Sequence, residues 1–348
     1  MNDMTSLLNL KREQFHVHIR KQRNEKQFKE SRKLYFLSLF PQQTQMQEIS
    51  AKIRDIMERG EQLCGELLIM IVEKIEEVLE NESNLKLLDT IDAAIWMLKS
   101  VDAQIYEDEL SDNYKMQRII DKMIPLSQGY SIHQGQMNQQ IIIYAAKFLK
   151  YWTLIDDKQI YNYYGEVAET VYFLLNKQEV IFIKRGVEIM LNLFECDDGR
   201  LLSKLHELLI CGQNLVKPIC ILLQNHQNCD IQTTLCKIVL QTFLMQDKNG
   251  MNQYLNYTNQ ENQLTFFDIL IELVQESEEN SRKLFRYQLH IIHLILEYSS
   301  SERELLYEYF KQKMNSSEFR IKMKDQWVFH EWNSIQNVVN QIQTHLEE

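Results

Sequence analysis

The sequence predicts an all-α protein, and three observations lead to that fold class. Only three prolines and nine glycines occur among 348 residues, whereas strand-and-turn architectures need those residues at their turns. The helix-forming residues Leu, Glu, Gln and Lys are abundant. Hydrophobic residues make up 45% of the chain and recur at helical spacing. We therefore expect an array of packed helices with enough apolar surface for a core.

The first element is a strongly basic segment, residues 11–33. It holds nine basic and three acidic side chains, a net charge of +6, although the whole chain carries −11. Residues 34–348 hold 29 basic and 45 acidic side chains, a net charge of −16. Such an asymmetry is typical of an interaction tail attached to a folded body. We predict two parts, a basic arm at 1–40 and a helical-repeat domain at 41–348.

The body contains a repeated pattern, which is clearest at 218–244, "PICILLQNHQNCDIQTTLCKIVLQTFL". Pro218 is suited to the first turn of a helix, where its missing N–H costs nothing. The run "NHQNCD" then interrupts the helical pattern. A second helix is predicted after it, with one apolar face. That face consists of Ile231, Leu235, Ile238, Val239 and Thr242.

Similar segments occur at 78–102, 139–157, 171–198 and 269–300. Their matching positions are Ala94, Ala145, Gly186, Leu235 and Leu289, separated by 51, 41, 49 and 54 residues. The small residues at three of these positions would let helices cross closely. A helical repeat of this length predicts a right-handed α-solenoid of armadillo/HEAT-like repeats. A non-repetitive helical bundle is the alternative, because the copies match in pattern more than in identity.

The arm has an ordered pattern of basic and apolar residues. A basic pair, Lys11-Arg12, is followed by three alternating apolar residues (Phe15, Val17, Ile19), Arg20-Lys21, Glu25, Phe28 and the final basic pair Arg32-Lys33. In order and spacing this pattern resembles the importin-β-binding segment of importin-α proteins, a basic helix that precedes an armadillo-repeat body. The resemblance implies that a carrier of the importin-β type binds this arm. The residues implied to bind it are Lys11, Arg12, Phe15, Val17, Ile19, Arg20, Lys21, Arg23, Phe28, Arg32 and Lys33.

The body departs from that family in its groove. Importin-α proteins carry a ladder of Trp and Asn, four residues apart, on successive repeats, and the Trp rings hold the stems of Lys and Arg in an extended peptide. The matched Trp positions here are Trp96, Lys147, Glu188, Lys237 and Ile291. The matched Asn positions are Ser100, Tyr151, Asn192, Gln241 and Ile295. From these, Trp96, Ser100, Tyr151, Asn192 and Gln241 are the candidate cargo-groove residues. Most of the ladder is missing, so simple basic peptides should bind weakly.

Two functions remain open. The first is a nuclear import adaptor, which binds an importin-β-like carrier through its arm and protein or peptide cargo on its groove. This reading places the protein in the cytoplasm and the nucleus. The second is a non-enzymatic helical scaffold or assembly subunit that docks protein partners. The arm pattern favours the first function, and the incomplete groove favours the second.

Other classes are disfavoured. The sequence contains no Gly-rich phosphate loop, nucleophile elbow or HExxH motif, so we expect no enzyme, cofactor or metal. His226 and Cys229 have a metal-ligand spacing, but no second pair follows. The longest apolar run, "LLIMIV" at 67–72, is too short to span a bilayer, and no membrane partner is expected. Nucleic acid is disfavoured by the −16 charge of residues 34–348.

Overall fold

The computed structural model confirms the all-α class for the residues that it describes. These are 45–60, 63, 65–81, 84–130, 138–155, 157–195, 215–225, 228–245, 248–277, 281–302, 304–322 and 337–344. They form helices joined by short connections, and one isolated antiparallel bridge joins Thr258 to Thr265. The arm at 1–40 lies outside the described residues, so its helix and its boundary stay predictions.

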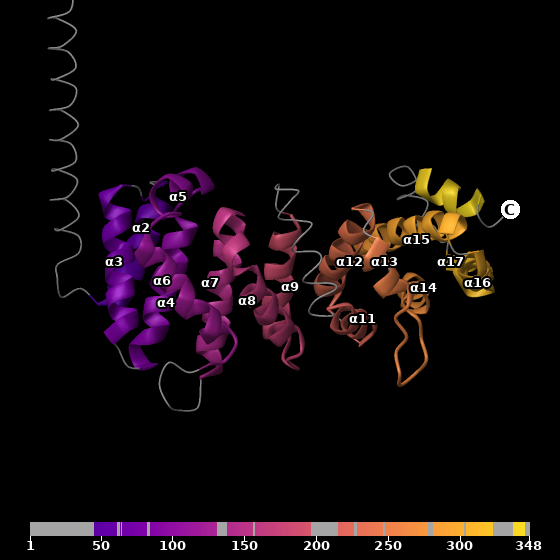
Figure 1. Ribbon diagram of the computed structural model, residues 1–348, viewed down its shortest axis with the longest axis horizontal. Helices are drawn as coiled ribbons and strands as arrows, with labels where there is room; N and C mark the ends of the chain where they lie inside the picture. The colour runs from indigo at the N-terminus through magenta and orange to yellow at the C-terminus, as the bar shows by residue number, and fades with distance from the viewer. Residues whose placement is uncertain are drawn as a thin grey trace, which may run out of the picture. The chain divides into compact units, whose positions relative to one another are not determined.

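The chain divides into two compact units. The first comprises the residues up to Met123 together with Met137–Asp156. Its helices are α2 (Met46–Glu58), α3 (Glu66–Asn81), α4 (Asn84–Lys99), α5 (Ala103–Glu109), most of α6 (Tyr114–Ser127) and α7 (Gln139–Ile155). Helix α4 packs against α2, α3 and α7 (Figure 1).

The second unit comprises Ile124–Gln136 and Asp157–Glu348. Its helices after the last turn of α6 are α8 (Asp157–Leu175), α9 (Val180–Phe194), α11 (Val216–Asn225), α12 (Cys229–Leu244), α13 (Lys248–Leu255), α14 (Phe266–Glu276), α15 (Arg282–Glu302), α16 (Glu304–Met314) and α17 (Ser317–Lys322). Residues 337–344 are also helical. Helix α12 packs against both α9 and α15, and α14 contacts α11, α15, α16 and α17.

Several helix ends follow from local sequence signals. Pro218 lies in the first turn of α11, where the helix needs no N–H from it. The Asn228 side chain accepts hydrogen bonds from the backbone N–H groups of Asp230 and Ile231 and so caps α12. At the start of α14, Thr265 and Asp268 form a reciprocal capping box. The Asn228 cap explains why the break predicted at 225–230 separates α11 from α12.

The core contains the residues that the repeat pattern predicted. Every residue of the predicted apolar face of α12 is buried, from Ile231 at 3% exposed to Leu235 at 0%. Ala94 and Ala145 are fully buried, and Gly186 packs against α8. Trp152 is fully buried as well. Because each large apolar side chain contributes about 1.5–3 kcal/mol when it is buried, packing between helices dominates the stability.

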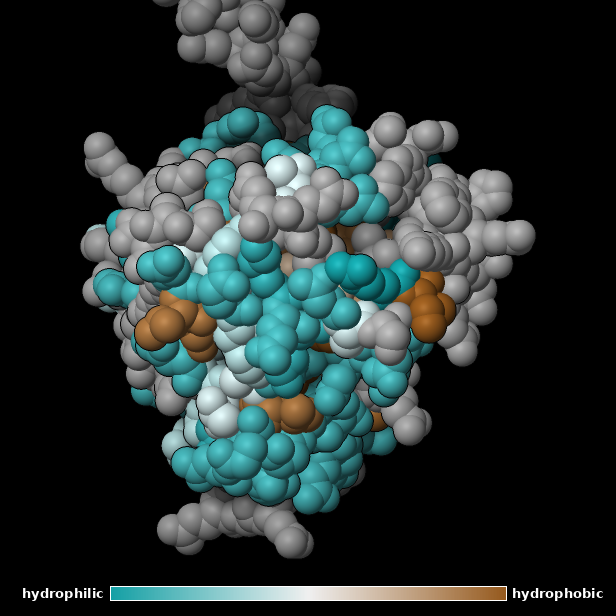
Figure 2. Space-filling view, turned by 90° about the vertical axis from the view of Figure 1, so that its right-hand side faces the viewer, coloured by the Kyte–Doolittle hydropathy of each residue, from teal (hydrophilic) through white to brown (hydrophobic). Residues whose placement is uncertain are grey.

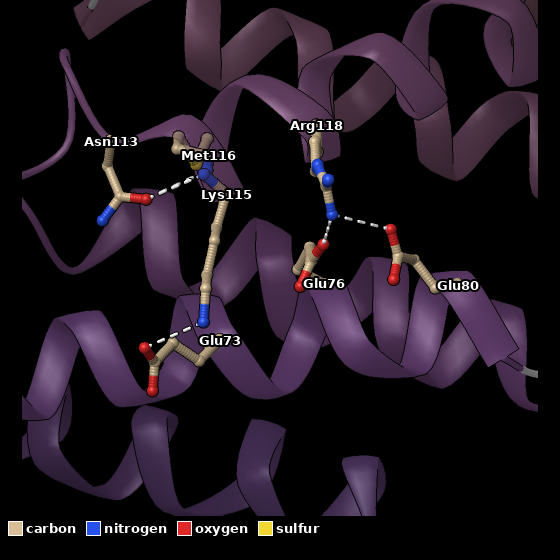
Figure 3. A network of polar contacts seen from close by, with 7 residues as sticks. All are labelled: Glu73, Glu76, Glu80, Asn113, Lys115, Met116 and Arg118. Atoms are coloured by element: carbon tan, nitrogen blue, oxygen red, sulfur yellow. Dashed lines mark hydrogen bonds and ion pairs between the residues drawn. The ribbon is translucent and has the colours of Figure 1, made fainter.

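Charged side chains also join α3 to α6, as Figure 3 shows. The Arg118 guanidinium donates to Glu76 at 2.9 Å and to Glu80 at 3.0 Å. One turn away, Lys115 Nζ lies 2.9 Å from a carboxylate oxygen of Glu73. Hydrogen bonding to Glu73 raises the pKa of Lys115, and hydrogen bonding to Glu76 raises that of Arg118. The two basic residues of α6 are therefore charged and form ion pairs with acidic residues of α3.

The surface turned to the viewer in Figure 2 is mainly hydrophilic. Its hydrophobic areas are small and separate from one another. The most exposed large apolar side chain among the described residues is Leu305 on α16, at 90%, and Ile321 on α17 is 65% exposed. Isolated exposed apolar residues are normal on soluble proteins and do not by themselves mark an interface.

Candidate functional site

Two of the candidate groove residues, Trp96 and Tyr151, are brought together in the first unit by the packing of α4 on α7. Both side chains are partly exposed. Between them lies Lys99, whose Nζ atom is 4.2 Å from the Trp96 ring centroid and 5.0 Å from that of Tyr151. We call Trp96, Lys99 and Tyr151 the Lys99 cluster. It places a cation of the chain itself where the resemblance would place a cation of a bound peptide.

Basic side chains surround the two rings of this cluster. The Arg54 guanidinium of α2 lies 5.0 Å from the Trp96 ring centroid, and it also pairs with Asp92 at 3.3 Å. On α7, the Nζ atom of Lys150 lies 5.6 Å from the Tyr151 centroid. Lys147, one turn earlier on the same helix, lies 5.5 Å from the Tyr144 centroid. Cation–π contacts of this kind contribute about 0.5–1 kcal/mol each where water has access.

Ser100 differs from its predicted neighbours because it is buried. The residue is 5% exposed, and its hydroxyl donates a hydrogen bond to the Met97 carbonyl oxygen at 2.7 Å. This hydroxyl is therefore committed to the last turn of α4 and does not offer a donor to a ligand. The sequence match had placed Ser100 at an Asn position of the groove.

Lys99 is the residue that the repeat comparison missed. It lies three residues after Trp96, and side chains at that spacing share one face of a helix. That spacing was a usable signal, because a Lys at this position reaches the ring beside it. Its second contact, with Tyr151, depends on the packing of a helix about 50 residues later and has no local signal.

In the second unit, Asn192 of α9 and Gln241 of α12 are both partly exposed. The matched Trp positions of these two helices hold charged residues with partners inside the chain. Glu188 pairs with Arg185 at 2.5 Å, and Lys237 forms an ion pair with Glu195. At both positions the structure therefore has ion pairs within the chain.

The positions that the sequence match assigns to a groove on α15 are buried. Ile291 and Ile295 are both 0% exposed. Partly exposed residues beside them on this helix include His290 and Leu294. Because adjacent helical residues point about 100° apart, a small error in the match is enough to select core positions.

A surface cavity of about 690 Å³ lies elsewhere in the second unit, between α11 and the connection that follows α13. It is lined by Val216, Lys217, Ile221, Asn225, Gln253, Asn256, Tyr257, Thr258, Asn259, Gln260 and Glu261. Burial, with Cys220 and Glu261 nearby, raises the pKa of Tyr257 to about 12. The cavity therefore presents amide groups and a neutral phenol beside the charged side chains of Lys217 and Glu261.

The implied carrier-binding residues, Lys11 to Lys33, lie outside the described residues, and their roles stay predictions. Over the described ranges, no group of three or more His, Cys, Asp or Glu side chains could hold a metal ion. Within the same ranges, none of the helices combines the length and the apolar character needed to cross a membrane.

Comparison with known proteins gives a distant structural likeness. No family model matches the chain, and no curated protein matches it. Among solved structures, the chain is similar to the crystal structure of an engineered protein, at 13% sequence identity and a TM-score of 0.48. That alignment covers 79% of this chain and 97% of the engineered one. The relationship to importin-α proteins stays a prediction from the sequence of the arm.

Proposed function

We propose that this protein is a non-enzymatic adaptor of the importin-α kind, in which armadillo-like repeats dock a protein cargo and the arm at 1–40 binds an importin-β-type carrier. The observation that carries the docking role is the Lys99 cluster, where partly exposed aromatic and basic side chains from α4 and α7 meet. Adjacent helices that expose such side chains provide a continuous surface for an extended peptide.

The order of helix lengths supports armadillo-like repeats within this proposal. The short helix α5 is followed by the longer α6 and α7. In the second unit, the short helix α13 is likewise followed by the longer α14 and α15. Such a short–long–long triplet is the unit that a right-handed solenoid of this kind repeats, and successive third helices would line its groove.

The arm supports the carrier part of the proposal by its pattern and charge. A net charge of +6 over 11–33 suits an acidic carrier surface, and such a segment can become ordered on binding. Transport by such a carrier would place the protein in both the cytoplasm and the nucleus. Carrier binding and cargo binding would use separate parts of the chain.

The test is binding of a purified importin-β-type carrier to the full chain and to a chain lacking 1–40. We expect the deletion to abolish carrier binding while the helical circular dichroism of the body is retained. Two double variants separate the pattern from simple charge. Arg20→Glu with Lys21→Glu changes the patterned pair, and Lys26→Glu with Lys29→Glu makes the same charge change outside it. An equal loss of carrier binding in both double variants would show that the arm acts only as a non-specific basic tail. Full carrier binding by the chain lacking 1–40 would refute the carrier role.

A helical scaffold without a transport role is the second candidate. It is favoured by the pairing of Glu188 with Arg185 and of Lys237 with Glu195, which occupies two matched groove positions. A scaffold would dock partners on the body, and its basic arm would hold a neighbouring acidic protein or nucleic acid instead of an importin-β-type carrier. The carrier experiment therefore also separates the two functions.

A further inference from the structure

Two lysine ammonium groups from different helices lie around the ring of Tyr151. Lys99 of α4 approaches it to 5.0 Å and Lys150 of α7 to 5.6 Å, measured from Nζ to the ring centroid. Lys99 also lies 4.2 Å from the Trp96 ring centroid, and Arg54 reaches that ring to 5.0 Å. The aromatic surface in this part of the first unit is thus already in contact with cations of the chain.

This arrangement sets the charge of any ligand that the cluster can accept. A Lys or Arg side chain entering between Trp96 and Tyr151 would have to displace Lys99 and would meet Lys150 as well. Like charges at such separations repel each other, and the repulsion grows as water is excluded. A carboxylate, in contrast, would accept hydrogen bonds from the same ammonium groups, and bonds between charged partners are among the strongest in proteins.

We propose that the Lys99 cluster, together with Lys150, binds an acidic peptide segment of a protein partner. Carboxylates of the segment pair with Lys99 and Lys150, while the ammonium groups keep their contacts with the rings of Trp96 and Tyr151. Leu154, which lies three residues after Tyr151 on α7 and is 60% exposed, offers an apolar contact beside the charges. The inference builds on the proposed docking role and names the chemistry of the docked segment.

A peptide suits this surface better than a nucleic acid does. Binding to a polyphosphate requires a long row of cations, because each neutralised phosphate contributes to the affinity. Here the basic residues come from α2, α4 and α7, and one of them, Arg54, is paired with Asp92. Residues 34–348 carry a net charge of −16, which opposes the binding of a long polyanion. A few carboxylates need only the few cations of the Lys99 cluster and Lys150.

The test is fluorescence polarisation with the full chain and a labelled peptide of Glu residues around a central Leu, at about 0.15 M salt. The same peptide with every Glu replaced by Lys and a labelled single-stranded oligonucleotide are the comparison probes. We expect saturable binding of the acidic peptide and at least about tenfold weaker binding of both others, since one hydrogen bond to a charged group is enough for that ratio.

The matched variants are Lys99→Glu and Lys86→Glu, which make the same charge change on the same helix. Lys86 is exposed and lies in the first turn of α4, ten residues before Trp96, which is about 15 Å along the helix axis. We expect Lys99→Glu to weaken the acidic peptide by at least about tenfold and Lys86→Glu by less than about threefold. Lys150→Glu is the second variant of the site, and the helical circular dichroism of each variant must match that of the wild type.

The outcomes are distinct from those of the carrier experiment. Equal affinities of the Lys99→Glu and Lys86→Glu chains, or no saturation with the acidic peptide, would overturn the inference. Tighter binding of the Lys peptide or of the oligonucleotide would overturn it in favour of that ligand. None of these results bears on carrier binding by residues 1–40, so failure of the proposed transport role and failure of this site can be told apart.

Discussion

A Cβ atom placed on Gly186 would lie 3.0 Å from the Cβ of Leu174, so α9 approaches α8 closely at this glycine. The same Cβ would lie 3.2 Å from a methyl carbon of Leu175. Gly165, in the middle of α8, has no heavy atom within 4 Å of the corresponding position. Gly165 and Gly186 therefore provide a matched pair.

We predict opposite effects of alanine at the two positions. Gly165→Ala should stabilise the protein by about 0.5–1 kcal/mol, because alanine removes backbone entropy from the unfolded chain. Gly186→Ala should destabilise it by roughly 1 kcal/mol net, because overpacking outweighs the same propensity gain. Urea unfolding monitored by circular dichroism measures both changes. A stabilising Gly186→Ala would mean that α8 and α9 can separate at no cost.

The second prediction concerns the buried carboxylate of Asp268 on α14. Burial alone would raise its pKa, but hydrogen bonds from Lys313, Thr265 and Tyr309 outweigh that effect and lower it. A carboxyl group with a depressed folded pKa contributes stability above its unfolded pKa of about 4, and this contribution is lost as the pH falls through the folded value.

We therefore expect the unfolding free energy of the wild type to fall more steeply below about pH 4 than that of Asp268→Asn. At neutral pH, Tyr309→Phe should cost about 1 kcal/mol, since it removes one donor to the carboxylate. Tyr172→Phe is the control, because Tyr172 is 43% exposed. Parallel pH profiles for wild type and Asp268→Asn would contradict the role given to this carboxylate.

The third prediction uses the two carboxylates that share Arg118. The side chain of Glu76 is 9% exposed and that of Glu80 is 40% exposed. Water screens the exposed pair more strongly, so a double-mutant cycle should give a larger coupling for Arg118 with Glu76 than with Glu80. The substitutions are Arg118→Met, Glu76→Gln and Glu80→Gln. Raising the salt concentration should reduce the Glu80 coupling first; the reverse order would show that exposure does not control these contacts.

The fourth prediction joins the basic arm to the acidic body. Because both lie in one chain, tethering holds the arm at an effective concentration on the order of millimolar. We expect residues 11–33 to contact acidic surface at low salt and to be released as salt rises, since exposed charges are screened over about 8 Å at physiological ionic strength. Amide exchange of this segment between roughly 0.02 and 0.5 M salt measures the effect. Equal exchange at both limits with no protection would exclude self-docking, and protection at both would indicate specific burial.

Local features of the fold were predictable from the sequence alone, because they depend on neighbours a few residues apart. Pro218, Asn228 and the apolar face from Ile231 to Thr242 define two helices and the break between them. Ala94, Ala145 and Gly186 likewise marked buried positions before any packing was known. The charge division between the arm and the remainder is also a property of the sequence.

Only the tertiary structure decided which side chains share a surface. The repeat comparison identified Trp96 and Tyr151, but the position of Lys99 between them depends on the packing of α7 against α4. At α15 the same comparison selected Ile291, which is buried, although the adjacent His290 is partly exposed. The physical reason is that hydrophobic periodicity locates a helical face only approximately, whereas a shift of one residue rotates a side chain by about 100°. Contacts between distant helices therefore decide which side chains share a surface.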